Sequence, residues 1–316
     1  MKDTILFGDC KDTLKTIDSK VQMCVTSPPY YGLRDYGGEE NQIGQENTPE
    51  EYINNLVEVF REVRNILSDD GVLWVNIGDS YYNYRPGKGQ GLVKQSVSKT
   101  NQDLPTKCNR RANKLEGLKE KDLIGIPWML AFALRSDGWY LRQDIIWHKP
   151  NPMPESVKDR CTKSHEYIFL LSKNKKYYYD NEAIKEPVKQ DLGTRDRTKG
   201  KYHNSGTGLS PHSGLSKSYD RKNKRSVWSV TNKPYKDAHF AVYPPDLIEP
   251  CILAGSKEGD IILDPFMGSG TTGMVAKKLG RHYIGCELHE SYAELIDKRV
   301  PVDKPVHNAL TMALNM

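Results

Sequence analysis

The stretch Asp260-Ile-Ile-Leu-Asp264-Pro-Phe-Met-Gly268-Ser-Gly270-Thr-Thr272 reads as a short apolar strand, a tight glycine turn and the start of a helix. Gly268 and Gly270 carry no Cβ, so the backbone can turn sharply there and approach a ligand closely. Asp264 ends the strand, and open α/β sheets bind ligands at that edge. The stretch therefore predicts an α/β fold with a binding site at the carboxyl edge of its sheet.

Strand-like and helix-like segments alternate along the rest of the chain. Short apolar, β-branched runs predict seven strands, at Thr4–Phe7, Val21–Val25, Val72–Ile77, Gln143–Trp147, Tyr167–Leu171, Ile261–Leu263 and His282–Cys286. Helical spacing occurs at Pro49–Leu67, Ile126–Asp137, Thr271–Leu279 and His289–Arg299. This alternation predicts a doubly wound, mostly parallel, seven-stranded sheet with helices on both faces.

Length and composition fit one large α/β domain with an inserted segment. The chain has 316 residues, of which 37% are hydrophobic, enough to form a core. No run approaches the roughly 18 apolar residues of a membrane span. The first residues, MKDTILFGDCKD, do not resemble a signal peptide. A cytoplasmic protein without a membrane partner is expected.

The six cysteines occur singly and form no Cys-x-x-Cys pair, so no metal site or redox motif is predicted. Several stand in apolar surroundings, which favours small buried side chains in a reducing compartment. The cysteines are Cys10, Cys24, Cys108, Cys161, Cys251 and Cys286.

Positive charge is concentrated in two segments that interrupt the strand and helix pattern. Residues 84–121 have a net charge of +7 and residues 185–236 one of +9, which leaves −11 on the remainder of a chain whose net charge is +5. An acidic body with two basic segments is typical of a protein that binds a polyanion. Two solvated loops with incidental lysines are the alternative reading. Residues 185–236 could also form a small irregular subdomain around Trp228.

A second informative stretch, Val25-Thr-Ser27-Pro28-Pro29-Tyr30-Tyr-Gly32, follows the second predicted strand. The two prolines cannot continue a central strand and fix the backbone in a rigid turn. Such a turn would hold the Ser27 hydroxyl and nearby carbonyl groups as hydrogen-bond acceptors, with Tyr30 as a flat face. An ordinary proline-rich loop is the alternative for a bare Pro-Pro pair.

Together the two stretches resemble the amino-methylating DNA methyltransferases. Ser27-Pro-Pro-Tyr30 is similar to their catalytic motif, and the segment from Asp264 to Thr272 is similar to their cofactor motif. The catalytic motif comes first, as in the permuted β group. Other matching blocks are Gly71–Asp79, Asp144–Pro152, His165–Ile168 and His239–Pro244. The resemblance implies a Rossmann-like methyltransferase fold, with only the two basic segments outside it.

The resemblance divides the chain into three parts. Residues 1–184 would form the catalytic part, in which 84–121 is an inserted basic loop. Residues 185–236 would recognise the DNA target, and residues 237–316 would bind the cofactor, S-adenosylmethionine.

In such enzymes the target amino nitrogen attacks the cofactor's methyl group in line. That nitrogen is a poor nucleophile, because its lone pair is delocalised into the base. By resemblance, the Ser27 hydroxyl and the Pro28 carbonyl would accept its protons, Pro29 would keep the turn rigid, and Tyr30 would stack on the base. The base must first leave the duplex.

The resemblance also implies which residues bind the cofactor. Asp264 and the glycine turn would hold its methionine part, Glu287 its ribose and Asp9 its adenine, although a turn-forming role is the alternative for Asp9. The predicted cofactor residues are Asp9, Phe240, Pro244, Asp264, Pro265, Phe266, Gly268, Ser269, Gly270, Thr271, Thr272 and Glu287.

Double-stranded DNA is the expected partner, and the basic segments would contact its phosphates. Four arginines are candidates for reading bases, since arginine pairs well with guanine. Lys149 and Asn151 could contact DNA or stabilise the catalytic loop. The candidate base-reading residues are Arg195, Arg197, Arg221 and Arg225. A homodimer and a cognate restriction endonuclease acting on the same site are further implied partners, in a bacterial or phage-borne enzyme.

The Ser-Pro-Pro-Tyr form favours N4 of cytosine in this family, whereas Asp-Pro-Pro-Tyr favours N6 of adenine, which stays open as the alternative. C5 methylation needs a cysteine nucleophile, typically in Pro-Cys-Gln, but Pro250-Cys251 continues as Ile-Leu. An RNA methyltransferase and a DNA-binding relative without activity are the remaining alternatives. The glycine turn lacks the Gly-x-Gly-x-x-Gly pattern of dinucleotide folds and the Gly-Lys-Ser/Thr of a P-loop.

Overall fold

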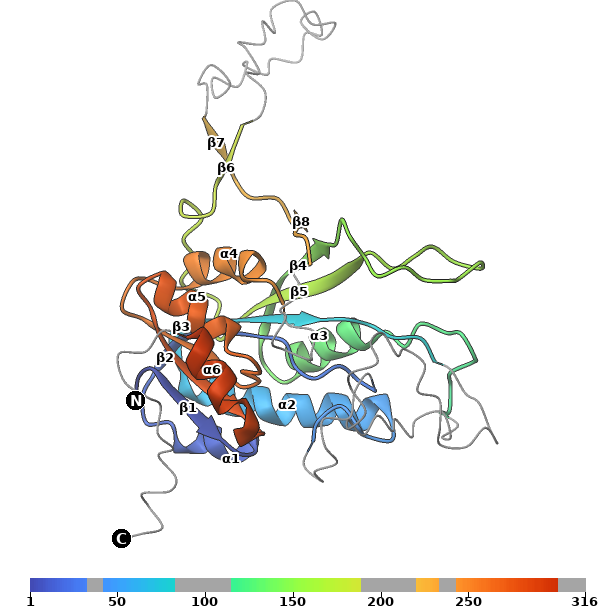
Figure 1. Cartoon of the computed structure of the whole chain (residues 1–316), viewed down its shortest axis with the longest axis horizontal. Helices are drawn as coiled ribbons and strands as arrows, with labels where there is room; N and C mark the ends of the chain where they lie inside the picture. The colour runs from blue at the N-terminus through green and yellow to red at the C-terminus, as the bar shows by residue number, and fades with distance from the viewer. Residues whose placement is uncertain (33–41, 83–114, 189–219, 233–242, 301–316) are drawn as a thin grey trace, which may run out of the picture.

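A computed structural model describes residues 1–32, 42–82, 115–188, 220–232 and 243–300 of the chain (Figure 1). Its centre is an eight-stranded sheet in the order β1-β10-β9-β2-β3-β5-β4-β8. All neighbouring strands are parallel except where β5 pairs with β3 and β4. The strands are β1 (Thr4–Phe7), β2 (Val21–Thr26), β3 (Leu67–Ile77), β4 (Tyr140–His148), β5 (His165–Ser172), β8 (Val227–Ser229), β9 (Ile261–Asp264) and β10 (His282–Glu287).

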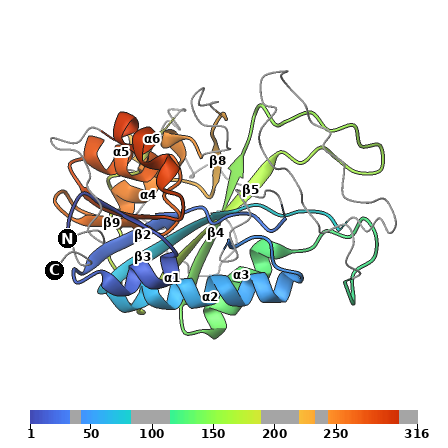
Figure 2. The same ribbon diagram turned by 60° about the horizontal axis from the view of Figure 1, so that its bottom comes forward.

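Helices cover both faces of this sheet (Figure 2). One face carries α1 (Cys10–Thr13), the 3-10 turn η1 (Leu14–Thr16), α2 (Pro49–Ile66) and α3 (Ile126–Ser136), and the other carries α4 (Pro245–Gly255), α5 (Thr271–Lys278) and α6 (Ala293–Arg299). Each layer buries its own apolar cluster against the sheet. The predicted doubly wound, mostly parallel fold is confirmed.

The long helix α2 shows how the sequence sets an element boundary. The Thr48 hydroxyl accepts a hydrogen bond from the Glu51 backbone N–H at 3.1 Å, and a Glu51 carboxylate oxygen accepts one from the Thr48 N–H at 3.3 Å. This reciprocal pair satisfies donors that the first turn leaves free, and Pro49 fits that turn because it has no N–H to pair. The stripe predicted from helical spacing, which includes Leu56 and Phe60, is fully buried.

All seven predicted strands are present, and the differences from prediction are local. An eighth strand, β8, pairs in parallel with the end of β4, so Trp228 lies in the main sheet and not in a separate irregular subdomain. Trp228 is buried beside Trp74, with 6.4 Å between ring centroids. The predicted helix His289–Arg299 begins as the 3-10 turn η5 (Glu290–Tyr292) and continues directly as α6.

A two-stranded ribbon, β6 (Glu186–Pro187) with β7 (Arg221–Lys222), extends away from the main sheet (Figure 1). Of the cysteines, the prediction of burial is confirmed for Cys10, Cys24, Cys251 and Cys286. It is wrong for Cys161, which is exposed on the loop between β4 and β5, and Cys108 lies outside the described residues. No helix in the described parts of the chain has the length and apolar character needed to cross a lipid bilayer.

Candidate active site

The two stretches singled out in the sequence lie next to each other at the carboxyl edge of the sheet. Strands β2 and β9 are parallel neighbours, with Cys24 opposite Leu263. The connections after them lead to helices on opposite faces, α2 and α5, so the chain diverges between these two strands. Open α/β sheets bind ligands at such a point of divergence.

The Asp264 side chain links the two stretches through hydrogen bonds. One of its carboxylate oxygens accepts hydrogen bonds from the Thr26 hydroxyl at 2.6 Å and from the Phe266 backbone N–H at 3.0 Å. The other oxygen accepts bonds from the Tyr243 hydroxyl at 2.9 Å and from the Thr272 hydroxyl. Burial raises the pKa of Asp264 above its usual range, and the four donors act in the opposite direction. The carboxyl group thereby ties the strand before Ser27 to the glycine turn.

A cavity of about 890 Å³ borders both stretches. Its lining comes mainly from the segments that follow β1, β2, β3, β4, β8, β9 and β10, from the start of β5 and from Tyr243 before α4. Predicted site residues on its wall are Asp9, Ser27, Pro28, Pro29, Tyr30, Lys149, Asn151, Pro265, Phe266, Gly268, Ser269, Thr271 and Glu287. Four other predicted site residues do not line the cavity: Pro244, Asp264, Gly270 and Thr272. Phe240 lies outside the described residues.

The glycine turn and the end of β10 form one side of the cavity. Gly268 has a φ of +52° and Gly270 one of +82°, left-handed values that favour glycine. The Glu287 carboxylate accepts hydrogen bonds from the backbone N–H groups of Gly268, at 2.8 Å, and His289, at 3.1 Å. Burial nevertheless raises the pKa of Glu287 to about 7. An acidic acceptor therefore stands at the tip of the strand next to the glycine turn, as the sequence predicted.

Asp9 follows β1 and lies on the same side of the cavity as the glycine turn. Its carboxylate accepts a hydrogen bond from the Lys11 backbone N–H at 2.9 Å and so caps the short helix α1. The turn-forming role considered as the alternative is present in the structure. Because Asp9 also lines the cavity, capping does not remove it from the predicted cofactor residues.

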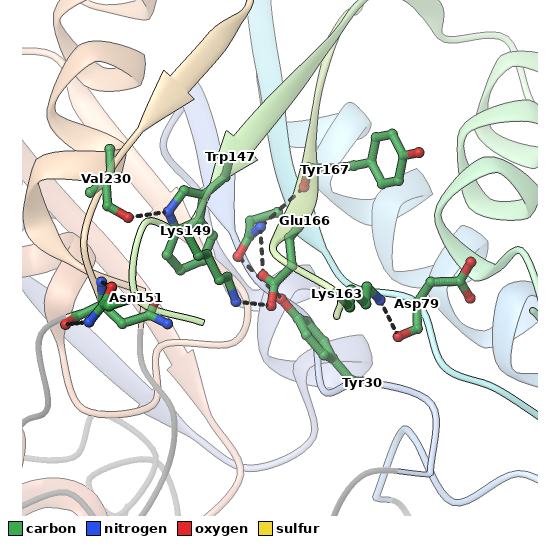
Figure 3. A network of polar contacts seen from close by, with 11 residues as sticks. Tyr30, Asp79, Trp147, Lys149, Asn151, Lys163, Glu166, Tyr167 and Val230 are labelled. Carbon is green, nitrogen blue, oxygen red and sulfur yellow. Dashed lines mark hydrogen bonds and ion pairs between the residues drawn. The ribbon is translucent and has the colours of Figure 1, made fainter. Parts of the chain in front are cut away.

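The turn that contains Ser27 and Tyr30 forms the opposite side of the cavity, and a polar network fixes Tyr30 (Figure 3). The Tyr30 hydroxyl donates to Glu166 at 2.6 Å and lies 3.3 Å from the Asn76 side-chain oxygen. Glu166 also accepts hydrogen bonds from Asn76, at 3.3 Å, and from the Lys149 ammonium group. Burial and the Glu166 charge raise the pKa of Tyr30 well above its usual range, whereas a hydrogen bond from Ser27 lowers it.

Further contacts hold the turn that contains Ser27 and Tyr30. The Tyr52 hydroxyl of α2 donates to the Pro29 carbonyl at 2.7 Å. Gly78 follows β3 under the Tyr30 ring, and a Cβ at that position would lie 2.7 Å from a Tyr30 ring carbon. The turn is therefore positioned by α2, β3 and β5 in addition to its own prolines.

Lys149 and Asn151 are both engaged within the protein. Lys149 pairs with Glu166 and lies over the Trp147 ring, 4.2 Å from its centroid. Asn151 exchanges two hydrogen bonds with the backbone of Asn232, at 3.0 and 3.2 Å. Both residues therefore have partners within the protein, and contact of either with DNA stays a prediction.

Two of the four candidate base-reading arginines, Arg221 and Arg225, do not line the cavity. Arg221 is exposed on the β6–β7 ribbon and donates to the Lys185 carbonyl at 2.9 Å. Arg225 is exposed as well and lies 3.8 Å from a Glu186 carboxylate oxygen. Arg195 and Arg197 lie outside the described residues.

Several cavity residues were not singled out by the sequence reasoning. Glu166 and Asn76 stood only inside matching blocks, and Lys163 was not considered. Lys163 lines the cavity and donates to the Asp79 carbonyl at 2.5 Å, and burial lowers the pKa of its ammonium group. A charged residue directly before a buried apolar run, as Glu166 is at the start of β5, is the signal that could have found it. In the described residues, acidic, histidine and cysteine side chains form no cluster that could bind a metal.

With this geometry in place, the chain can be compared with known proteins. Residues 21–298 match the family model of the N6/N4 DNA methylases. The chain belongs to this DNA methylase family. It is 48% identical to the Type II methyltransferase M.SmaI of Serratia marcescens, over 94% of this chain and 90% of that relative. It is 46% identical to M.Cfr9I of Citrobacter freundii, over 94% of this chain and 87% of that relative.

Solved structures show the same fold for this DNA methylase. The PvuII DNA methyltransferase, which is cytosine-N4-specific, superposes with a TM-score of 0.62 at 17% identity, over 96% of this chain and 88% of that chain. A putative DNA modification methylase from Thermus thermophilus, complexed with S-adenosyl-L-methionine, gives a TM-score of 0.58 at 22% identity, over 97% and 98% of the two chains.

Proposed function

We propose that this DNA methylase transfers a methyl group from S-adenosylmethionine to N4 of a cytosine that has been flipped out of duplex DNA. One observation carries the proposal. Ser27 and its rigid turn share a single cavity with the glycine turn and Glu287, and the Asp264 carboxyl group holds the two sides in register. The cavity therefore has room for a methyl donor on one side and an acceptor base on the other.

The methyl donor is S-adenosylmethionine, and the donor side of the cavity suits its chemistry. Gly268 allows close approach of a ligand because no Cβ stands there, and the Glu287 carboxylate can accept hydrogen bonds from two ribose hydroxyls. Asp9 lines the cavity as well, and we propose that it binds the adenine amino group, with Pro265 and Phe266 as an apolar surface. When bound, the cofactor supplies an electrophilic methyl carbon on its sulfonium.

On the other side, the protein prepares the amino nitrogen. The Ser27 hydroxyl and the Pro28 carbonyl are the acceptors proposed for its protons, while the Pro29 carbonyl is occupied by Tyr52. Because prolines and tertiary contacts fix these acceptors before the reaction, little reorganisation is needed in the transition state. Glu166 anchors the Tyr30 hydroxyl, and the ring of Tyr30 is the face on which we propose that the base stacks.

We propose cytosine as the target, and not adenine, because of Ser27. Amino-methylating DNA methyltransferases that act on adenine typically carry an aspartate at this position. A serine accepts a proton less strongly than a carboxylate, but this does not by itself exclude adenine N6. N6-adenine methylation therefore remains the second candidate. We propose that residues 185–236 recognise the target sequence in DNA. We also propose that the protein forms a homodimer, and that it acts together with a restriction endonuclease that has the same recognition site.

The test is to express the chain in cells that lack DNA methylation and to sequence their DNA by a methylation-sensitive method. Mass spectrometry of the released nucleosides distinguishes N4-methylcytosine from N6-methyladenine. Ser27→Ala should abolish the modification, whereas Ser136→Ala, which alters an exposed serine at the end of α3, should leave it intact. N6-methyladenine alone would overturn the choice of base, and methylated RNA with unmodified DNA would overturn the choice of substrate.

A further inference from the structure

The loop of residues 149–164 is much longer than its place in the fold requires. It joins the antiparallel neighbours β4 and β5, and such neighbours need only about two to five residues between them. The loop runs outward beyond the ends of both strands (Figure 1). Long loops inside compact domains are usually functional, so we expect this loop to have a function.

Side chains brace the loop at several points. Near its start, Asn151 exchanges two hydrogen bonds with Asn232. Farther along, the Glu155 carboxylate accepts bonds from Arg160 at 2.6 Å and from the Lys163 backbone N–H at 3.2 Å. The loop is therefore held in a defined position relative to the cavity that it borders.

Met153 stands on this braced loop between two prolines. Pro152 and Pro154 fix their own φ angles, and Pro154 also restricts the backbone of the methionine before it. The Met153 side chain is 68% exposed, the highest exposed fraction among the large hydrophobic residues of the described chain. Single exposed hydrophobic residues are common, so exposure alone would mean little. Met153, however, also lines the cavity that contains Ser27, so it lies where that cavity meets solvent.

We propose that Met153 enters the DNA stack and occupies the space that the target base leaves behind. This inference rests on the proposed function, since it requires a base flipped into the cavity. The vacated space in a duplex is apolar and flat, and proteins that distort DNA insert methionine and other apolar side chains between base steps. Methionine is unbranched and adapts to such a space. Lys163 lines the same cavity, and its ammonium group can attract the phosphates of the entering strand.

The test compares single-turnover methyl transfer to two oligonucleotide duplexes that carry the recognised site. In one duplex the target base is paired, and in the other it stands opposite a mismatch, where leaving the stack costs least. Met153→Ala should slow transfer to the paired duplex about tenfold or more, while transfer to the mismatched duplex should stay within about twofold of the unaltered protein. Met153→Leu should restore most of the rate on the paired duplex.

Leu123→Ala is the matched control, because Leu123 is 52% exposed but does not line the cavity, and it should leave both rates unchanged. Equal losses on both duplexes for Met153→Ala would overturn the proposal, since they would place Met153 against the cofactor or in folding. The absence of any loss would overturn it as well. If the unaltered protein methylates neither duplex, the proposed function itself has failed.

Discussion

The ion pair between Lys149 and Glu166 should stabilise the side of the cavity that contains Tyr30 by a measurable amount. Their side chains are only 17% and 13% exposed, and Glu166 also accepts hydrogen bonds from Tyr30 and Asn76. Removing one partner of a fully buried pair costs about 3–5 kcal/mol, because the other charge is left without compensation. Since this pair retains some contact with solvent, we expect Glu166→Gln to lower the free energy of unfolding by about 2–3 kcal/mol.

A double-mutant cycle isolates the pair from its neighbours. Lys149→Met should cost less, about 1–2 kcal/mol, because Tyr30 and Asn76 continue to donate to Glu166. The double variant should then show a coupling energy of about 2 kcal/mol. Unfolding by urea is followed by tryptophan fluorescence and by circular dichroism, and coincidence of the two transitions tests for two-state behaviour.

Asp69→Asn serves as the control for this cycle. Asp69 is 94% exposed and lies 3.5 Å from Lys173, an ion pair of the exposed kind that contributes less than about 1 kcal/mol. A coupling energy below about 0.5 kcal/mol between positions 149 and 166 would refute the reasoning. It would mean that solvent screens the pair as effectively as it screens the exposed one.

Three further predictions concern the cavity and its ligands. Gly78→Ala should reduce methyl transfer about tenfold or more with little change in cofactor affinity, because its Cβ would displace the Tyr30 ring; wild-type rates would contradict this. The pKa of Glu287 is raised to about 7, so the acid is protonated below that pH and cannot accept both ribose hydroxyls. Calorimetry should therefore show weaker cofactor binding at about pH 6 than at about pH 8, and Glu287→Gln should remove the dependence. Affinity for duplex DNA should fall steeply with salt, and a flat response would count against phosphate contacts by the basic segments.

Much of the fold could be predicted because local patterns and tertiary packing agree. Apolar, β-branched runs predicted every strand of the central sheet except β8. That strand is short, and two of its three residues, Val227 and Ser229, are exposed, so it carries no apolar run. Its place in the sheet depends on the end of β4, which no local signal specifies.

The network around Glu166 could not be predicted for a different reason. Because β5 is antiparallel to its neighbours, its amino end lies at the edge where β3 and β4 end. This brings Glu166 beside Asn76 and Lys149 across large separations in the chain. The sequence around residue 166 does not indicate whether this strand runs parallel or antiparallel to its neighbours.

The sequence by itself determined the local features of the site in this DNA methylase. These are the glycine turn after β9, the acidic Glu287 at the end of β10, and Ser27 in the proline-containing turn after β2. These are local patterns, set by backbone geometry and by the spacing of apolar residues. Only the tertiary structure decided that Ser27, Glu287 and Met153 border one cavity. Strand order and strand direction follow from how the whole chain buries its apolar faces, and they bring distant residues together.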